Sequence, residues 1–343
     1  MTMPLSDMPA DPHDQLVVPD GIVLLATVCN TTRNAAPYAL WFARGPEQYL
    51  VDLTDLVNEG ADHGLTGLAY YDGQLFVAVQ SSRAPRILVF DNHMNCTETI
   101  MHPEFSDIHS LSVVHGDLIV ISTGNRSVVR LDVKRKTTST LFSTDAKIHV
   151  NSAIVENDGL LICCGGSGNL LAAATRGSVI DVTHQDVVVT GLGRPHSLAR
   201  SGGDFIVLDS LGERIIRFDR NGIIQEQALA GFLRGAATGA GCMFVAGSAS
   251  RIVSRKNPVA VSTRISWETF SERVCIYELD DKTLTVRRKH FPIVAGFEMY
   301  ELLVLEDADA FDPRQERLLV PDPYTMSRMF YEAAKYAAAE RPE

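Results

Sequence analysis

The stretch that decides the fold is Pro195-His-Ser-Leu-Ala-Arg-Ser-Gly-Gly-Asp-Phe-Ile-Val-Leu-Asp209. A polar motif around His196 is followed by a Gly-Gly-Asp turn signal and then by the apolar run 205–208. Turn residues between two short runs of this kind are typical of a β-hairpin. Polar residues are unexpected at the start of a strand that is followed by an apolar run. Their role can be inferred only if the motif is repeated along the chain.

The motif recurs along the chain. The equivalent positions, called anchors below, are Thr66, His109, Asn151, His196, Arg234 and Tyr300. They lie 43, 42, 45, 38 and 66 residues apart, and turn residues followed by an apolar run come after most of them. A period near 40 residues with several short strands in each repeat is typical of propeller blades. The sequence therefore predicts an all-β fold, a six-bladed β-propeller over residues 21–322.

The two ends of the chain are predicted to share the sixth blade. Residues 300–305 supply an inner strand with no room for a full blade after it. Residues 22–28, 38–43 and 48–53 supply three strands with no inner strand before them. N-terminal strands that join the C-terminal inner strand would close the ring and remove open sheet edges.

Three segments fall outside the repeat. Residues 1–20 are predicted to be an N-terminal extension, and an insertion over 251–272 is predicted to act as a lid. In residues 323–343, Met326, Met329, Phe330 and Ala333 follow helical spacing, which predicts a C-terminal amphipathic helix. That helix would pack on the propeller or form a homodimer contact.

Composition limits the partners. The chain has 343 residues and a net charge of −11, with no block of Lys and Arg, so we expect no nucleic-acid partner. No apolar stretch approaches the roughly 18 residues of a membrane span, and the first 20 residues do not read as a signal peptide. The six cysteines lack CxxC spacing, which indicates reduced thiols in a cytoplasmic protein.

The anchors predict a polar site on the ring axis. The first strand of a blade lines the central channel, and residues two apart on a strand face the same way. The resulting pairs are Gly64/Thr66, Asp107/His109, His149/Asn151, Arg194/His196, Phe232/Arg234 and Glu298/Tyr300. Their side chains are expected to converge at one mouth of the channel.

The three histidines suggest a metal site. His109, His149 and His196 come from three consecutive blades and are predicted to bind one divalent metal ion. Neutral imidazoles suit Zn, Fe, Ni or Cu, and a nearby carboxylate can complete or orient such a set. A metal with an open coordination position would polarise a substrate or activate water.

The remaining polar residues suggest a substrate and an acid–base role. Arg194 and Arg234 are predicted to bind a small anionic molecule, because guanidinium groups pair bidentately with carboxylates and phosphates. Asn151, Asp209 and Arg251 are predicted to add substrate contacts, and Glu298, Tyr300 and Asp107 are the candidate catalytic groups. The leading interpretation is a metal-assisted lyase, hydrolase or isomerase. The alternative is a non-catalytic propeller with a hydrated channel that binds a small ligand or a protein partner.

The motifs also resemble a known family. The segments GRPHSLAR, DFIVLDS, GFLRGAA and GFEMYELLVL, within about residues 105–305, resemble an uncharacterised bacterial family of hypothetical propeller proteins. More distantly, the layout is similar to gluconolactonase, strictosidine-synthase-like and NHL-repeat propellers. The likeness to peptide-amidating lyases of that architecture implies a metal held by His109, His149 and His196. The likeness to gluconolactonases implies calcium near Glu298, Asn151 and Asp209. A likeness of folds implies no particular reaction.

Overall fold

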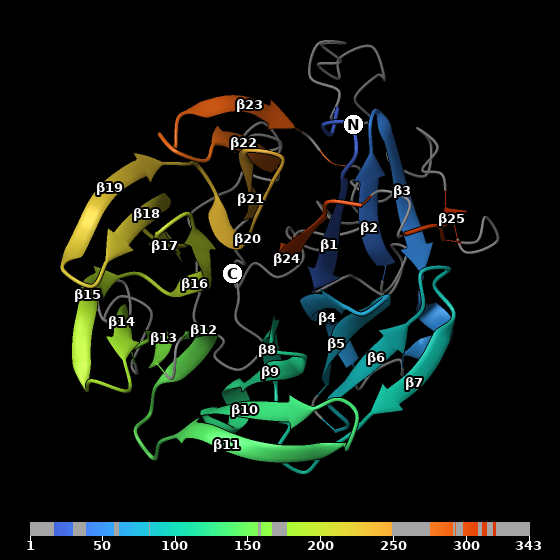
Figure 1. The fold of residues 1–343 in the computed structure, drawn as a ribbon, viewed down its shortest axis with the longest axis horizontal. Coiled ribbons are helices and arrows are strands. Elements are labelled where there is room, and N and C mark those ends of the chain that lie inside the picture. Colours follow the sequence, from blue (N-terminus) through green and yellow to red (C-terminus); the bar gives the residue numbers. More distant parts are fainter. Residues whose placement is uncertain are drawn as a thin grey trace, which may run out of the picture.

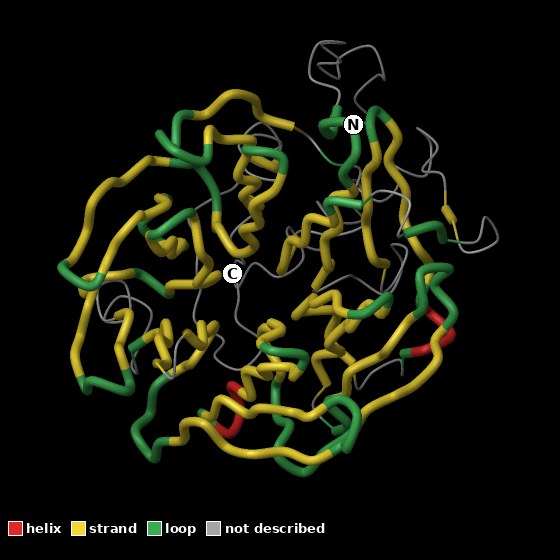
Figure 2. The backbone as a smooth tube through the Cα atoms, in the orientation of Figure 1, coloured by secondary structure: helices red, strands yellow, loops and turns green. Residues whose placement is uncertain are grey.

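The computed structural model describes residues 17–29, 39–57, 62–81, 83–156, 159–166, 177–248, 275–290, 292, 298–307, 311–313 and 318–319. Over these ranges the fold is all-β, and Figure 2 shows helix only in two short segments. These are η3 (Thr54–Leu56) and η4 (Thr123–Asn125). No helix in this part of the chain has the length and apolarity needed to cross a membrane. The predicted C-terminal helix and the insertion 251–272 lie outside the described residues.

Five units of four antiparallel strands follow one another along the chain (Figure 1). Unit 1 is β4 (Asp62–Tyr71), β5 (Gln74–Ser81), β6 (Arg86–Phe90) and β7 (Cys96–Ile100). Unit 2 is β8 (Ile108–Val114), β9 (Asp117–Ser122), β10 (Ser127–Asp132) and β11 (Thr137–Ser143). Unit 3 is β12 (His149–Glu156), β13 (Gly159–Gly165), β14 (Gly177–Asp181) and β15 (Asp186–Leu192). Unit 4 is β16 (Pro195–Ser201), β17 (Asp204–Asp209), β18 (Arg214–Asp219) and β19 (Gly222–Ala228). Unit 5 is β20 (Phe232–Gly239), β21 (Cys242–Ser248), β22 (Cys275–Asp280) and β23 (Val286–His290).

A sixth unit combines strands from both ends of the chain. It contains β24 (Glu298–Leu305), β1 (Val23–Cys29), β2 (Ala39–Arg44) and β3 (Glu47–Asp52), with β25 (Leu318–Leu319) beside β3. β1 pairs with β24 from Val23↔Leu305 to Cys29↔Glu298, and it touches β4 of unit 1 at Gly64. Figure 1 shows the units around a common centre, with β4, β8, β12, β16, β20 and β24 innermost. The fold is thus β-propeller-like, and the predicted sheet of N- and C-terminal strands is present.

Turn chemistry defines the ends of the strands. Asp72 and Gly73 have φ angles of 52° and 73°, and Ala240 and Gly241 have 51° and 70°. Two consecutive residues with positive φ form the type I′ turn, whose twist matches that of an antiparallel hairpin. The turn signals in the sequence therefore connect the first two strands of units 1 and 5.

The hydrophobic core is divided among the interfaces between neighbouring units. Trp41 of unit 6 and Phe244 of unit 5 lie in one cluster, and Phe42 of unit 6 and Leu65 of unit 1 lie in another. The other clusters join units 1 and 2, 2 and 3, 3 and 4, and 4 and 5. Each large side chain buried in this way stabilises the fold by about 1.5–3 kcal/mol.

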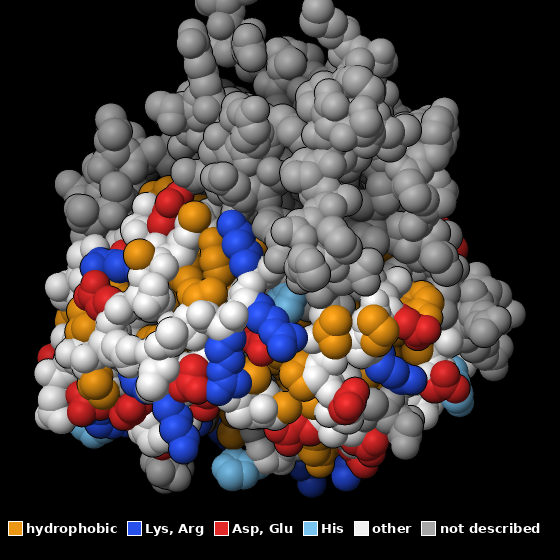
Figure 3. All heavy atoms as spheres, turned by 90° about the horizontal axis from the view of Figure 1, so that it is seen from above, with side chains coloured by type: hydrophobic (Ala, Val, Ile, Leu, Met, Phe, Trp, Pro, Cys, Tyr) orange, Lys and Arg blue, Asp and Glu red, His pale blue; other side chains and the backbone are white. Residues whose placement is uncertain are grey.

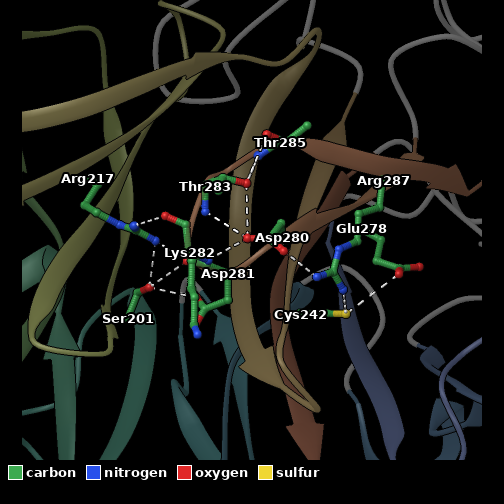
Figure 4. Close-up of polar contacts among 10 residues, drawn as sticks. All are labelled: Ser201, Arg217, Cys242, Glu278, Asp280, Asp281, Lys282, Thr283, Thr285 and Arg287. Atoms are coloured by element: carbon green, nitrogen blue, oxygen red, sulfur yellow. Dashed lines mark hydrogen bonds and ion pairs between the residues drawn. The ribbon is translucent and has the colours of Figure 1, made fainter.

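Polar contacts reinforce the interface between units 4 and 5 (Figure 4). The guanidinium group of Arg217 donates to the carbonyl oxygens of Asp281 and Lys282 in the turn between β22 and β23. Hydrogen bonds from the backbone N–H of Thr283 and from the Arg287 side chain hold the pKa of Asp280 far below its usual range, which fixes the same turn. On the surface, the coloured part of Figure 3 mixes basic, acidic and hydrophobic side chains.

A buried ion pair in unit 1 gives a test of the fold. Asp62 and Arg86 form a two-point pair at 2.7 and 3.2 Å, with side chains 0% and 7% exposed. Asp62→Asn leaves the buried guanidinium without its counter-charge and should lower the free energy of unfolding by about 3–5 kcal/mol in urea titrations. In the exposed pair Arg135–Asp132, where the arginine is 82% exposed, Arg135→Ala should change it by less than about 1 kcal/mol. Equal effects of the two variants would contradict the burial of the unit 1 pair.

Candidate functional site

A ring of side-chain hydrogen bonds joins each unit to the next at the centre of the fold. Each bond runs from a side chain of one unit to a backbone carbonyl on the inner strand of the following unit. From unit 1 onward, the pairs are Thr66 to Ile108, Thr123 to Val150, Asn151 to Pro195, Ser197 to Arg234, Ser248 to Met299 and, back to unit 1, Thr27 to Thr66. The anchors Thr66 and Asn151 therefore bridge neighbouring units as well as facing the centre.

Every inner strand has a β-bulge at its anchor. The pairing register shifts by one residue at Leu65/Leu68, Ile108/Leu111, Val150/Ser152, His196/Ala199, Leu233/Ala236 and Met299/Leu302. A bulge interrupts the strict alternation of side chains and redirects the extra residue. Both the anchor and the residue after it can then reach neighbouring units across the centre.

Five anchors and His149 form one group of contacts, called the axial cluster below. Its members are His109, His149, Asn151, His196, Arg234 and Tyr300. The Tyr300 hydroxyl lies 2.6 Å from His109 Nδ1, and the Asn151 Oδ1 atom lies 3.1 Å from the same nitrogen. The rings of His109 and His149 are 4.8 Å apart, and those of His196 and Tyr300 are 6.3 Å apart. His149 is exposed, whereas the other members are buried.

Arg234 brings a permanent positive charge to the cluster. Its guanidinium carbon lies 4.4 Å from the ring centre of Tyr300 and 4.9 Å from that of Phe232. Cation–π contacts of this kind hold a guanidinium group in a fixed plane. The predicted pairing of Phe232 with Arg234 is thus present, and it orients the charge.

His196 is neutral and has a defined tautomer. Burial and then the positive charges of Arg234, His109 and His149 lower its pKa well below the ordinary 6.5. Its Nδ1 atom lies 2.9 Å from the carbonyl of Arg194 and 2.8 Å from Ser210 Oγ, and the Ser210 hydroxyl donates to the Leu233 carbonyl. Two acceptors at Nδ1 require the hydrogen there. Nε2 therefore carries a lone pair.

The structure does not test the predicted metal ion, but it shows how the candidate ligands are engaged. Among the described residues, no three His, Cys, Asp or Glu side chains come together as a ligand set. His109 Nδ1 is occupied by Tyr300 and Asn151, and the Arg234 charge beside His196 opposes a dication. Asp107 does lie 3.6 Å from His109 Nε2 and is held by Gln80 at 2.6 Å. The metal stays a prediction, and no step below depends on it.

The other predicted site residues lie elsewhere or outside the description. The buried carboxylate of Asp209 receives hydrogen bonds from backbone N–H groups at residues 193 and 212 and from Arg214 at 2.9 Å, so it holds a turn of its own unit. Arg194 has a φ of 53° and is half-buried next to the cluster. Glu298 is described only as the first residue of β24, and Arg251 falls outside the described residues.

Glu301 is the residue that the sequence prediction missed. Strict alternation turns it away from Tyr300, but the bulge in β24 brings its carboxyl group to Ser110 Oγ at 3.1 Å and Ser197 Oγ at 3.2 Å. These serines belong to units 2 and 4, so the carboxyl group spans the centre. In units 1 and 5, which flank unit 6, the equivalent position is a glycine. A Cβ on Gly67 or Gly235 would lie 2.6–2.7 Å from a backbone nitrogen of the next inner strand. The sequence contained one signal for this role of Glu301: two repeats have glycine directly after the anchor, and the last repeat has a glutamate at the same position.

Two observations favour a protonated, neutral Glu301. Burial raises its pKa from 4.5 to about 8. Independently, Ser197 Oγ lies next to both the Arg234 carbonyl and the Glu301 carboxyl, and a hydroxyl has one hydrogen to give. If Ser197 donates to the carbonyl, the acid must donate to Ser197. Burial and this arrangement of donors both favour the protonated form of the Glu301 carboxyl group behind the axial cluster.

Comparison with known proteins gives the fold and no more. No family model matches the chain, and no curated protein matches it. Among solved structures, a chain in a crystal structure of a nidogen/laminin complex is similar, with a TM-score of 0.57 and 11% sequence identity. The match covers 85% of this chain and 100% of that chain. This likeness supports a β-propeller-like fold, while the bacterial family resemblance stays a prediction.

The low pKa of His196 predicts how stability depends on pH. The unfolded chain takes up this proton below pH 6.5 and the folded chain does not, so the protein loses stability as the pH falls below that value. His196→Gln should reduce the decrease in the free energy of unfolding between pH 7 and pH 5, measured by urea unfolding. His93→Gln, at a histidine whose side chain is 48% exposed, is the control, and the change in its pH profile should be smaller than that of His196→Gln. An unchanged profile for His196→Gln would rule out a buried neutral imidazole.

Glu301 predicts the opposite trend. The unfolded chain loses this proton above pH 4.5 while the folded chain keeps it up to about 8, so stability falls as the pH rises through that window. Glu301→Gln cannot ionise and should remove this decrease in stability. Between pH 4 and pH 7, the free energy of unfolding of wild type should therefore fall by on the order of 3 kcal/mol more than that of the variant. Glu98→Gln, at a carboxylate 40% exposed, should show no such effect. If the free energies of unfolding of wild type and Glu301→Gln change in parallel with pH, Glu301 is not protonated in the folded protein at neutral pH.

Proposed function

We propose that the axial cluster binds a small anionic molecule and acts on it by acid–base chemistry, as a lyase, hydrolase or isomerase. The observation that carries the proposal is the gathering of Arg234, His109, His149 and His196 around Tyr300. After burial, the nearby charge of Arg234 is the next cause that lowers the pKa of His196. A bound anion would offset the positive charge of Arg234. Fixed positive charge in a buried setting is the usual basis of anion recognition.

Four members of the cluster have a role in this proposal. Arg234 binds the anion, because it carries a permanent positive charge that the Tyr300 and Phe232 rings hold in place. The Nε2 lone pair of His196 accepts a hydrogen bond from the ligand. Tyr300 transfers the proton, and its contact with His109 tunes the hydroxyl group.

The proposal includes a closed six-bladed ring. The pairing of β1 with β24 and the hydrophobic cluster between units 6 and 1 support it, as does the hydrogen bond from Thr27 to Thr66. A closed ring is what holds six anchors around one centre. The cysteines among the described residues are all free thiols, which suits the predicted cytoplasmic location.

Arg234→Gln tests anion binding directly. Titration of the protein with malonate and with inorganic phosphate, followed by calorimetry, should show binding that weakens by about tenfold or more in the variant, since a charge-assisted hydrogen bond is lost. Arg200→Gln is the matched control. The Arg200 guanidinium carbon also lies over an aromatic ring, 5.6 Å from the ring centre of Phe205, but outside the axial cluster. Equal affinities for wild type and Arg234→Gln would contradict the anion site.

Tyr300→Phe separates catalysis from binding. Small carboxylates, phosphate esters and lactones are incubated with the protein, and their consumption is followed by NMR. Wild type should consume at least one class, while Tyr300→Phe should still bind and lose turnover by at least about a hundredfold, the contribution of a positioned acid or base. Binding without any turnover in wild type would favour the non-catalytic alternative.

A further inference from the structure

We infer that Glu301 is a positioning residue for Arg234, which it holds in place through the hydroxyl group of Ser197 only while its own carboxyl group is protonated. The inference rests on the proposed function for its consequence, which is a dependence of anion binding on pH. Its structural part concerns a single hydrogen atom, that of the Ser197 hydroxyl group. This part is testable without a ligand.

Ser197 of β16 lies between the other two residues. Its Oγ atom contacts the carbonyl oxygen of Arg234 and lies 3.2 Å from Glu301 Oε1. All three residues are buried. Glycine at position 235 lets β20 approach β24, because a Cβ there would lie 2.9 Å from the carbonyl carbon of Glu301. The two strands therefore meet where Ser197 bridges them.

The direction of the two hydrogen bonds depends on the proton of Glu301. A hydroxyl group has one hydrogen to donate, and a carbonyl oxygen only accepts. When Glu301 is protonated, its acid group donates to Ser197 and Ser197 donates to the Arg234 carbonyl. When Glu301 is ionised, it only accepts. The Ser197 hydrogen then turns to the carboxylate, which is the stronger acceptor, and the Arg234 carbonyl loses this bond.

Other groups on the strands around Glu301 also face its carboxyl group or its backbone. Ser110 Oγ lies 3.1 Å from Glu301 Oε2, and the backbone N–H of Leu302 donates to the carboxyl group. Thr27 Oγ1 accepts from the backbone N–H of Glu301 at 3.0 Å. The titratable and charged residues on the surrounding strands are Cys163 (β13), His109 (β8), His196 (β16), Arg234 (β20) and Tyr300 (β24).

The proton of Glu301 is lost in a convenient range. Burial outweighs the hydrogen bonds to the carboxyl group and raises its pKa to about 8. Burial also raises the pKa of Cys163, so this thiol keeps its proton over the same range. His196 is neutral throughout, because burial lowers its pKa. Glu301 therefore ionises while these two neighbours do not change.

The position of Arg234 depends on both ends of the residue. The rings of Tyr300 and Phe232 hold its guanidinium group, at 4.4 and 4.9 Å from the guanidinium carbon, and Ser197 holds its carbonyl. Contacts behind a binding group keep it in the geometry that the ligand needs. The anion should therefore bind best when Glu301 is protonated, and its affinity should fall as the pH rises through about 8.

The first experiment follows the Arg234 carbonyl by NMR in the full-length protein without ligand. Carbon-13 at the arginine carbonyl and nitrogen-15 in glycine select the Arg–Gly peptide bonds, which are 44–45, 176–177 and 234–235. The signal of 234–235 is the one that Arg234→Gln removes. It should titrate with a midpoint near pH 8 in wild type. A signal that stays constant between about pH 6.5 and 9.5 would overturn the inference without any further variant.

Two variants test the route through Ser197. Glu301→Gln keeps a donor toward Ser197 and an acceptor toward Ser110, so the 234–235 signal should keep its low-pH position over the whole range. Ser197→Ala removes the bridge, so the titration of this signal should disappear. If the titration persists in Ser197→Ala, Glu301 reaches Arg234 by another route and the inference fails.

The matched control is Ser110→Ala. Ser110 contacts the same carboxyl group from unit 2, and its hydrogen bond lowers the pKa of Glu301. The variant should keep the titration of the 234–235 signal, with a midpoint at higher pH, because the ionised form loses a donor. Loss of the titration in Ser110→Ala as well as in Ser197→Ala would mean that any disturbance of this layer has the same effect, and would contradict a specific bridge.

Anion binding is the second readout. Malonate, whose carboxylates stay ionised above about pH 7, should bind wild type on the order of fivefold more weakly at about pH 9.5 than at pH 7, the worth of one hydrogen bond. Its affinity for Glu301→Gln should not change. A constant affinity in wild type beside a titrating 234–235 signal would show that Glu301 does not position the guanidinium group. Malonate binding that is absent, or equal in Arg234→Gln, would contradict the proposed function, and the 234–235 signal then decides the role of Glu301 alone.

Discussion

The fold depends on how the inner strands satisfy their backbone at the centre. An inner strand has a partner strand on one side only, so part of its peptide groups face the axis without a sheet neighbour. Buried carbonyls need donors, and here hydroxyl and amide side chains of the preceding unit supply them. The same residues that could touch a ligand therefore also hold neighbouring units together. Among the described anchors, the side chains of His196, Arg234 and Tyr300 are not the donors of these bonds between units.

The repeated bulge explains why the centre contains two polar layers. Each bulge sends two consecutive residues inward, so one set of side chains forms the axial cluster and the next set contains Glu301, Ser110 and Ser197. The first layer contains the permanent charge of Arg234, and burial raises the pKa of Glu301 in the second. A protonated acid behind Arg234 suits an anion, because an ionised carboxylate at that place would compete with the ligand.

The repeat in the sequence allowed much of the fold and of the axial cluster to be predicted. The period of the anchors predicts the units, and the leftover strands at the two ends predict the composite sheet that β1 and β24 form. Contacts among His109, His149, Asn151 and Tyr300 also follow from the repeat. Glu301 was hidden because a period of two assumes a regular strand, and a bulge is decided by the packing of neighbouring units. The turn-holding role of Asp209 was hidden because it depends on backbone N–H groups that composition does not reveal.

The composite sheet has a consequence for synthesis. β1, β2 and β3 leave the ribosome first, yet their inner partner β24 is made after five other units. Until then, the edge of β1 that pairs with β24 stays unsatisfied, and such an edge invites pairing with other chains. The units in between can form in order as they emerge, whereas the sixth must wait. The sixth unit is therefore completed only after β24 has been made, and nascent chains are most exposed to misassociation until then.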